Sequence, residues 1–365
     1  MSELPSFAID VRMADRTGIG RYIRGIVSSL EPSPLCRYVF VGSHKIQSHI
    51  PSNWPFISTE VPIYSVQEQM VMPRLAGQAA GLHVPHYNAP VFWKKKLVVT
   101  VHDLIHIHFK EHLSSLVAAW YGETMLRRIV KQADRIITVS EATKNDLIRT
   151  LNADPRKITV IHHGIDSSFL NDDQGEPSAS RKIASLYFLY VGLIKAHKNV
   201  GVLLNAFTHL KKNSEFKNVK LILIGKTDSK QRIVREWLGK MKSEPDIQLI
   251  DYANDAELKQ YYRNAAAFIS PSLCEGFGFP LIEAMASKVP VIASRIEATM
   301  EVLGDTGLYF EAQSSIELEK QMKRIIEEPH LRSRLTTVAF KRLSLFDWHR
   351  AAKQTKEVYE SVLSS

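Results

Sequence analysis

The segment SPSLCEGFGFPLIEAMASKVPVIAS, residues 270–294, carries the clearest local pattern in the chain. An apolar run, AAFIS at 266–270, leads into a glycine-spaced loop at 275–279, and Pro280 then stands where a first helical turn would begin. A second β-branched run, PVIA at 290–293, follows the helix. A strand, loop, helix and strand in this order predict a parallel α/β unit.

The loop that enters this helix is a candidate anion site, because the first backbone N–H groups of a helix have no partner within it. The residues that would present them are Gly276, Phe277, Gly278 and Phe279. Glu275 and Glu283 flank the loop, and since carboxylates repel phosphate we expect them to accept hydrogen bonds from sugar or ribose hydroxyls. A capped helix start with one solvated glutamate explains the same residues equally well.

Similar runs recur along the 365 residues in two series, separated by a polar stretch at 171–184 that predicts a linker. The first series predicts strands at 7–11, 37–42, 82–85, 97–102, 135–139 and 158–162. The second predicts strands at 186–191, 219–224, 247–250, 266–270 and 290–293. We therefore expect two doubly wound α/β domains, 1–172 and 173–345.

Two helices are predicted from apolar periodicity. The first spans 114–133, with a buried face that includes Trp120. The second follows Asp347, a residue suited to cap its N-terminus. Its apolar stripe consists of Trp348, Ala351, Ala352, Thr355, Val358, Tyr359, Val362 and Leu363. Because this stripe is too apolar to remain in solvent, we expect the helix to pack against one of the domains.

Composition narrows the class of protein. Two cysteines allow no disulfide framework, and neither a signal peptide nor an apolar run of about 18 residues is visible, so we expect a cytoplasmic protein. The net charge of +9 is spread over both halves without a basic arm, which argues against nucleic acid as a partner. The basic clusters at 94–96 and 127–131 are either solvated faces or a surface for an anionic lipid.

Three further motifs fail on spacing or geometry. The GKT at 225–227 lacks the glycine of a P-loop, since Lys220 stands there. The pair Gly18 and Gly20 lacks the third glycine of a dinucleotide loop. Histidines at 102, 106, 108 and 112 leave a strand, so they are not expected to converge on a metal.

The Glu-x7-Glu pattern within EGFGFPLIE, followed by EAMASKVPVIAS, resembles the donor-site signature of glycosyltransferase family 4. VGLIKAHKN, residues 191–199, resembles the segment of that family whose basic pair grips the donor diphosphate. Here the pair is His197 and Lys198, with histidine in place of the usual arginine. The resemblance implies a GT-B fold, in which two Rossmann-like domains with parallel sheets face a central cleft.

The first half carries the resemblance through TGIGRY, PHYNAP, TVHDLIH, VSEATKNDL and HHGID, and these segments are similar to a mannosyltransferase-like branch that builds bacterial surface polysaccharides. It implies that Gly18 and Gly20 lie near the donor phosphate and that His102 faces the reacting sugar. The helix 346–365 is expected to cross back to the first domain. His163 stands where the family has asparagine.

The resemblance implies a retaining hexosyltransferase that uses a nucleotide-diphosphate sugar, GDP-mannose as the first expectation and a UDP-sugar as the second. Lys198, His197 and the 276–279 loop would hold the diphosphate, Glu275 the transferred sugar and Glu283 the ribose. The acceptor would be a glycan or a lipid-linked glycan, reached in contact with an anionic membrane. No metal and no cofactor are expected, because Lys198 and a helix N-terminus already supply positive charge.

Two other functions remain open on sequence. A sugar-nucleotide 2-epimerase shares the architecture and would turn over the donor without an acceptor. A noncatalytic protein that binds a sugar nucleotide or a polyanion would keep the same loops without turnover.

Overall fold

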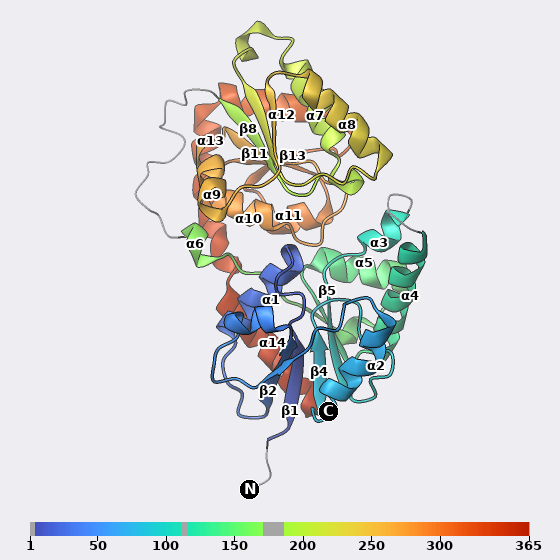
Figure 1. Ribbon diagram of the computed structural model, residues 1–365. Helices are drawn as coiled ribbons and strands as arrows, with labels where there is room; N and C mark the ends of the chain where they lie inside the picture. The colour runs from blue at the N-terminus through green and yellow to red at the C-terminus, as the bar shows by residue number, and fades with distance from the viewer. Residues whose placement is uncertain (1–3, 111–115, 171–185, 365) are drawn as a thin grey trace. The chain divides into compact units, whose positions relative to one another are not determined.

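The computed structural model describes residues 4–110, 116–170 and 186–364, which form two compact units (Figure 1). Unit 1 contains the chain up to His108, its continuation to Gly164, and everything from Phe346 onward. Unit 2 contains Ile165–Leu345 and the short stretch that begins at Phe109. The break falls after Gly164 rather than at residue 172, and the predicted linker at 171–184 lies outside the described residues.

Unit 1 is built on a parallel sheet of seven strands in the order β3-β2-β1-β4-β5-β6-β7. The strands are β1 (Ser6–Asp10), β2 (Arg37–Gly42), β3 (Phe56–Ser58), β4 (Gly81–Val84), β5 (Lys96–Val101), β6 (Arg135–Thr138) and β7 (Ile158–Val160). The helices are α1 (Gly18–Ser29), α2 (Val66–Leu75), α3 (Ile105–His108), α4 (Leu116–Gln132), α5 (Glu141–Leu151) and α14 (Trp348–Leu363).

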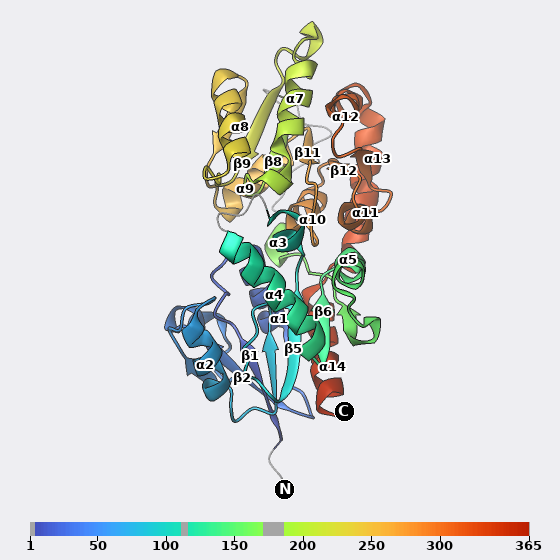
Figure 2. The same ribbon diagram turned by 90° about the vertical axis from the view of Figure 1, so that its right-hand side faces the viewer.

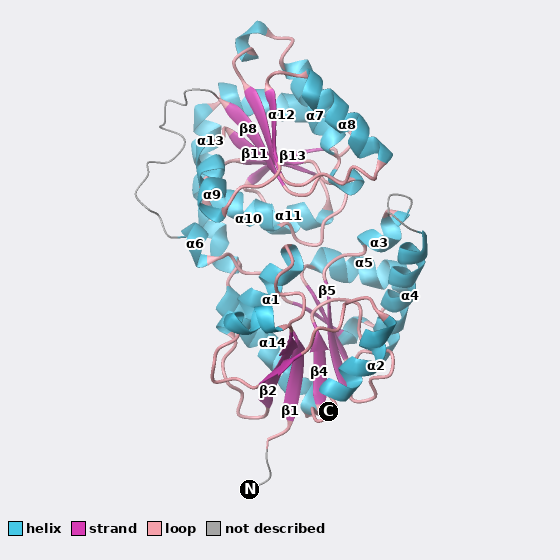
Figure 3. Ribbon diagram, viewed as in Figure 1, coloured by secondary structure: helices cyan, strands magenta, loops and turns pink. Residues whose placement is uncertain are grey.

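Unit 2 has a parallel sheet of six strands in the order β10-β9-β8-β11-β12-β13, flanked by helices on both faces (Figure 3). The strands are β8 (Tyr187–Val191), β9 (Lys220–Ile224), β10 (Ile247–Ile250), β11 (Ala267–Ser270), β12 (Val291–Ser294) and β13 (Gly307–Phe310). The helices are α6 (Ser167–Leu170), α7 (Val200–Leu210), α8 (Arg232–Ser243), α9 (Asp255–Asn264), α10 (Phe279–Ala286), α11 (Glu297–Leu303), α12 (Ser315–Glu327) and α13 (Pro329–Arg342).

The predicted strands form within one or two residues of their expected bounds, but the prediction missed β3 and β13. Both are short, and neither FIS nor GLYF shows the period of a longer strand. The expectation for Trp120 was wrong, since 69% of this residue is exposed. Met125, Ile129 and Val130 of α4 are buried, so this part of the helix packs on the sheet.

Helix α14 is part of unit 1, where it packs against α1. The Asp347 side chain accepts a hydrogen bond from the backbone N–H of Arg350 at 2.7 Å, as the predicted cap requires. Trp348 fills a slot between Gly25 and Gly164, because a Cβ at either glycine would overlap the indole. Farther along, the Tyr359 ring stacks on Phe7 of β1 at a centroid distance of 4.4 Å. Among the described helices, none has the length and hydropathy that crossing a bilayer requires.

Candidate active site

Each sheet has one point at which its strand order reverses, and open parallel sheets bind ligands in the crevice outside the strand ends there. In unit 2 this point lies between β8 and β11, with β9 on the far side of β8. The chain after β8 carries His197 and Lys198 in a short 3-10 turn, and the chain after β11 carries Glu275. A backbone hydrogen bond from Leu273 N–H to the His197 carbonyl, 2.8 Å, joins the two loops.

Lys198 and Glu275 form an ion pair at this point of unit 2. The Lys198 Nζ lies 2.6 Å from Glu275 Oε1, and the Ser272 hydroxyl donates to the same oxygen at 2.6 Å. Burial by itself raises the pKa of the Glu275 carboxyl, but the charge and hydrogen bond of Lys198 outweigh it, so the pKa is lowered. The predicted phosphate contact and the predicted sugar contact are therefore charged and adjacent.

Helix α10 begins directly after this loop. Gly278 caps it with φ +97, a left-handed conformation that disfavours other residues, and Pro280 lies in the first turn as predicted. Phe277 is buried, with its ring centroid 6.0 Å from that of Phe279. The backbone of the loop, rather than its side chains, is thus what a phosphate would meet.

Glu283 lies on α10 and is 3% exposed. Its Oε2 accepts a hydrogen bond from the Tyr262 hydroxyl of α9 at 2.8 Å. Sequence reasoning missed Tyr262, because nothing in the spacing of residues 262 and 283 indicates their contact. The hydrogen bond fixes the carboxylate on the side of α10 that packs against α9.

In unit 1, we expected Gly18 and Gly20 in a loop after β1, but both lie in the first turn of α1. The structural need for glycine differs between the two positions. A Cβ at Gly20 would approach the carbonyl oxygens of Met13 and Ala14 to 2.8 and 2.7 Å, so glycine is needed for close packing. Gly18 is exposed, and a Cβ there would meet nothing within 4 Å.

His102 follows β5, next to the reversal point of unit 1 between β1 and β4. Its Nε2 lies 2.9 Å from the Pro85 carbonyl, and its ring packs edge-on against Tyr22 at 5.1 Å. Burial lowers the pKa of His102, so the ring is neutral near pH 7 and its proton sits on Nε2. Nδ1 is then left as a hydrogen-bond acceptor. His163 lies beside it, buried, with a ring distance of 5.7 Å.

A buried polar cluster that sequence reasoning missed fills the reversal point of unit 1. Its members are Asp10, Arg12, Glu68, His86 and Asn88, all of them less than one-tenth exposed. They come from the end of β1, from α2 and from the chain after β4. The PHYNAP segment contains two of them, but no local signal connects it to the other three.

Asp10, Glu68 and His86 offer ligand atoms within 4.8 Å of one another, the spacing of a metal site. Arg12 already occupies this space and donates to both carboxylates. His86 Nδ1 accepts the Asn88 N–H at 3.1 Å, which leaves the ring proton on Nε2, where a metal would need a lone pair. The cluster therefore suits hydrogen bonding rather than a cation.

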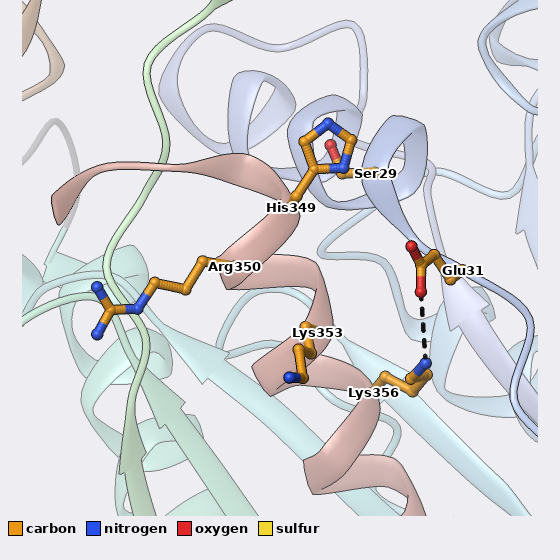
Figure 4. A pocket seen from close by; sticks show the side chains of 6 residues that line it. All are labelled: Ser29, Glu31, His349, Arg350, Lys353 and Lys356. Carbon is orange, nitrogen blue, oxygen red and sulfur yellow. Dashed lines mark ion pairs between the residues drawn. The ribbon is translucent and has the colours of Figure 1, made fainter. Parts of the chain in front are cut away.

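A pocket of about 250 Å³ lies on α14, away from the strand ends (Figure 4). It is lined by Ser29, Glu31, His349, Arg350, Lys353 and Lys356. Lys356 lies 3.8 Å from Glu31, and the Arg350 side chain points away from the others. None of these six lining residues is buried, so we interpret the pocket as a solvated charged face.

Two family profiles match the chain. One, described as glycosyl transferases group 1, matches residues 177–342, and the other, glycosyltransferase family 4, matches 26–169. Among curated relatives, the O-antigen chain mannosyltransferase RfbU of Salmonella typhimurium is 30% identical over 68% of this chain and 65% of its own length. The O-antigen chain mannosyltransferase B of Escherichia coli is 26% identical over 75% and 74%. The chain thus spans just under two thirds of the first of these relatives.

Solved structures agree on the fold. The Anabaena protein HepE, crystallised with UDP and glucose, superposes with a TM-score of 0.75 at 18% identity, covering 98% of this chain and all of that one. Sucrose-phosphate synthase from Thermosynechococcus elongatus gives 0.75 at 19% identity, covering 99% of both chains. With matches across both units, the chain belongs to glycosyltransferase family 4 and has the GT-B fold.

Proposed function

We propose that the protein is a retaining hexosyltransferase that takes its sugar from a nucleotide-diphosphate donor, GDP-mannose first and a UDP-sugar second. The observation that carries the proposal is the Lys198 and Glu275 pair at the reversal point of unit 2, beside the N-terminus of α10. The names of the curated relatives, O-antigen chain mannosyltransferases, support a mannosyl donor and a polysaccharide product. HepE, which has also been crystallised with UDP-glucose, supports a nucleotide sugar as the ligand class.

The proposed chemistry breaks the bond between the anomeric carbon and the diphosphate and forms a bond to an acceptor hydroxyl on the same face. Negative charge then grows on the leaving diphosphate, where the Lys198 ammonium and the N–H groups at the start of α10 stabilise it. The departing phosphate takes the proton of the acceptor. In unit 1, the neutral His102 ring keeps Nδ1 as a hydrogen-bond acceptor for a sugar hydroxyl. In this scheme neither a metal nor a cofactor is needed.

A donor screen tests the function. The protein is incubated with GDP-mannose, GDP-glucose, UDP-glucose and UDP-N-acetylglucosamine, with and without an oligosaccharide acceptor, and products are measured by mass spectrometry. We expect transfer to the acceptor from one nucleotide class with the anomeric configuration retained. Conversion of the donor sugar into its C2 epimer without acceptor would indicate an epimerase, and tight binding without turnover would indicate a noncatalytic protein.

The acceptor is proposed to be a growing glycan on a lipid carrier, met at the cytoplasmic face of an anionic membrane. The outer face of α4 supports this, since it is turned away from the sheet of unit 1 (Figure 2). Trp120 of α4 is 69% exposed, and Phe92, in the chain between β4 and β5, is 64% exposed. The Arg128 guanidinium of α4 donates to the Val91 carbonyl at 2.8 Å, which places a cation next to the segment that carries Phe92. Aromatic and basic groups together are suited to a lipid headgroup region.

Cosedimentation with vesicles tests this contact. Arg127→Glu with Arg128→Glu should lower partitioning onto phosphatidylglycerol vesicles roughly thirtyfold or more, because each cation near an anionic surface contributes about 1 kcal/mol. The matched control is Arg350→Glu with Lys353→Glu, which makes the same charge change in the α14 pocket. Equal losses in both variants, or no binding by the unaltered protein, would contradict the assignment of α4.

A further inference from the structure

The buried cluster at the reversal point of unit 1 contains one polar atom whose hydrogen bonding is incomplete. His86 is 1% exposed, and its Nε2 has no hydrogen-bond partner among the described residues. The nearest acidic oxygen, Asp10 Oδ2, lies 3.9 Å away, which is too far for a direct hydrogen bond. Because Nδ1 accepts the Asn88 N–H, the neutral ring presents Nε2 as a donor.

The rest of the cluster holds this donor and the carboxylate in place. Arg12 donates to both Asp10 oxygens, at 2.9 and 2.6 Å, and to Glu68 at 2.5 Å. Glu68 in turn accepts from the Asn88 amide. Such a buried ionic network adds little stability over apolar packing. Its position at a ligand-binding crevice therefore favours a functional reason for it.

The ring of Tyr64 lies beside His86 at a tilt of 58°, with the two centroids 6.0 Å apart. Tyr64 is 46% exposed and adopts φ +63, a strained conformation for a tyrosine. Its backbone N–H is held by Glu68 at 2.8 Å. The Tyr64 side chain also contacts Tyr87, with the ring centroids 6.0 Å apart. A ligand can therefore reach His86 only if Tyr64 turns aside and gives up this contact.

We propose that His86 and Asp10 form a subsite for one hydroxyl group of the acceptor glycan. A hydroxyl oxygen about 2.8 Å from each atom accepts from His86 Nε2–H and donates its proton to Asp10 Oδ2, which completes the bonding of both. A hydroxyl both donates and accepts, whereas an anion is repelled by Asp10 and a cation by Arg12. The inference depends on the proposed glycosyl transfer and names the residues of unit 1 that position its acceptor.

The test compares His86→Phe, His86→Gln and the matched control His349→Phe, an exposed histidine on α14. Methyl α-mannopyranoside serves as acceptor, and transfer, hydrolysis of the donor by water and affinity for the free nucleoside diphosphate are measured. His86→Phe should raise the acceptor KM about tenfold or more, while hydrolysis and nucleotide affinity change less than about twofold. His86→Gln, which keeps an N–H donor, should recover part of the loss.

A parallel fall in hydrolysis and nucleotide affinity would show a general structural role and overturn the subsite, as would an unchanged acceptor KM. If the unaltered protein neither transfers nor hydrolyses any donor, the proposed function fails. The subsite is then decided separately by saturation-transfer NMR with methyl α-mannopyranoside, where equal signals from the unaltered protein and the His86→Phe variant overturn it. Should His86→Phe not fold, a crystal structure with the methyl glycoside decides. A glycan hydroxyl between Nε2 and Oδ2 supports the subsite, and an ordered water alone overturns it.

Discussion

Replacing Lys198 with alanine is expected to lower kcat by about 10²–10³-fold, the effect of removing one preorganised group that stabilises charge in a transition state. Lys198 Nζ is the cation that the structure places at the reversal point of unit 2, 2.6 Å from Glu275. The loss should fall on kcat and on kcat/KM alike, because charge builds on the diphosphate mainly as the glycosidic bond breaks. Steady-state kinetics with the donor identified in the screen measure it.

Substitutions of Glu275, in the loop before α10, and of Glu283, on α10, are expected to have different kinetic effects. Glu283→Gln keeps an oxygen that can accept from Tyr262, so the fold is retained while ribose binding weakens, and the donor KM should rise with kcat nearly unchanged. Glu275→Ala removes the partner of Lys198 and the proposed sugar contact, and kcat should fall roughly a hundredfold. Free nucleoside diphosphate should bind less tightly to the Glu283 variant only. The reverse pattern would show that the two roles are exchanged.

Much of the fold could be predicted because buried parallel strands are apolar runs that stand out between amphipathic helices. The runs at 37–42 and 247–250 became strands with those bounds. Short edge elements such as β3 contribute only three residues, too few for any period to be visible. The exposed Trp120 shows a second limit of sequence-based prediction. Periodicity indicates which residues share a helix face, but not how far that helix extends over its sheet.

The candidate site was predictable where it is local in sequence and not where strand order assembles it. Pro280 and the glycine loop mark the start of α10 by themselves. The pairing of residues 198 and 275 depends on β8 and β11 being neighbours, which no spacing reveals. The Asp10 and His86 cluster likewise requires β1 to lie beside β4. The order of the strands in each sheet decides which residues meet at the site, and sequence patterns do not give that order.

Removal of residues 346–365 is expected to unfold unit 1 while unit 2 remains folded. Without α14, the sheet of unit 1 loses the stacking of Tyr359 on Phe7 and the hydrogen bond between His83 Nδ1 and the Tyr359 hydroxyl, 2.6 Å. The slot beside Gly25 and Gly164 loses its indole as well. Hydrogen exchange read separately over β1, β4 and β5 and over β8 and β11 distinguishes the two units.

Trp348→Ala measures how much the packing of α14 contributes to the stability of unit 1. Trp348 is 8% exposed and its slot has glycine backbones on two sides, so the cavity cannot be filled by neighbouring side chains. The free energy of unfolding of unit 1 should fall by about 3–5 kcal/mol. Trp120→Ala, the same change at a residue 69% exposed, should cost less than about 0.5 kcal/mol. A helix that packs on unit 1 through Trp348 must protect the strand beneath it from exchange. Equal free energies of unfolding for the two tryptophan variants, or unchanged hydrogen exchange in β1 after the deletion, would therefore show that α14 does not stabilise unit 1.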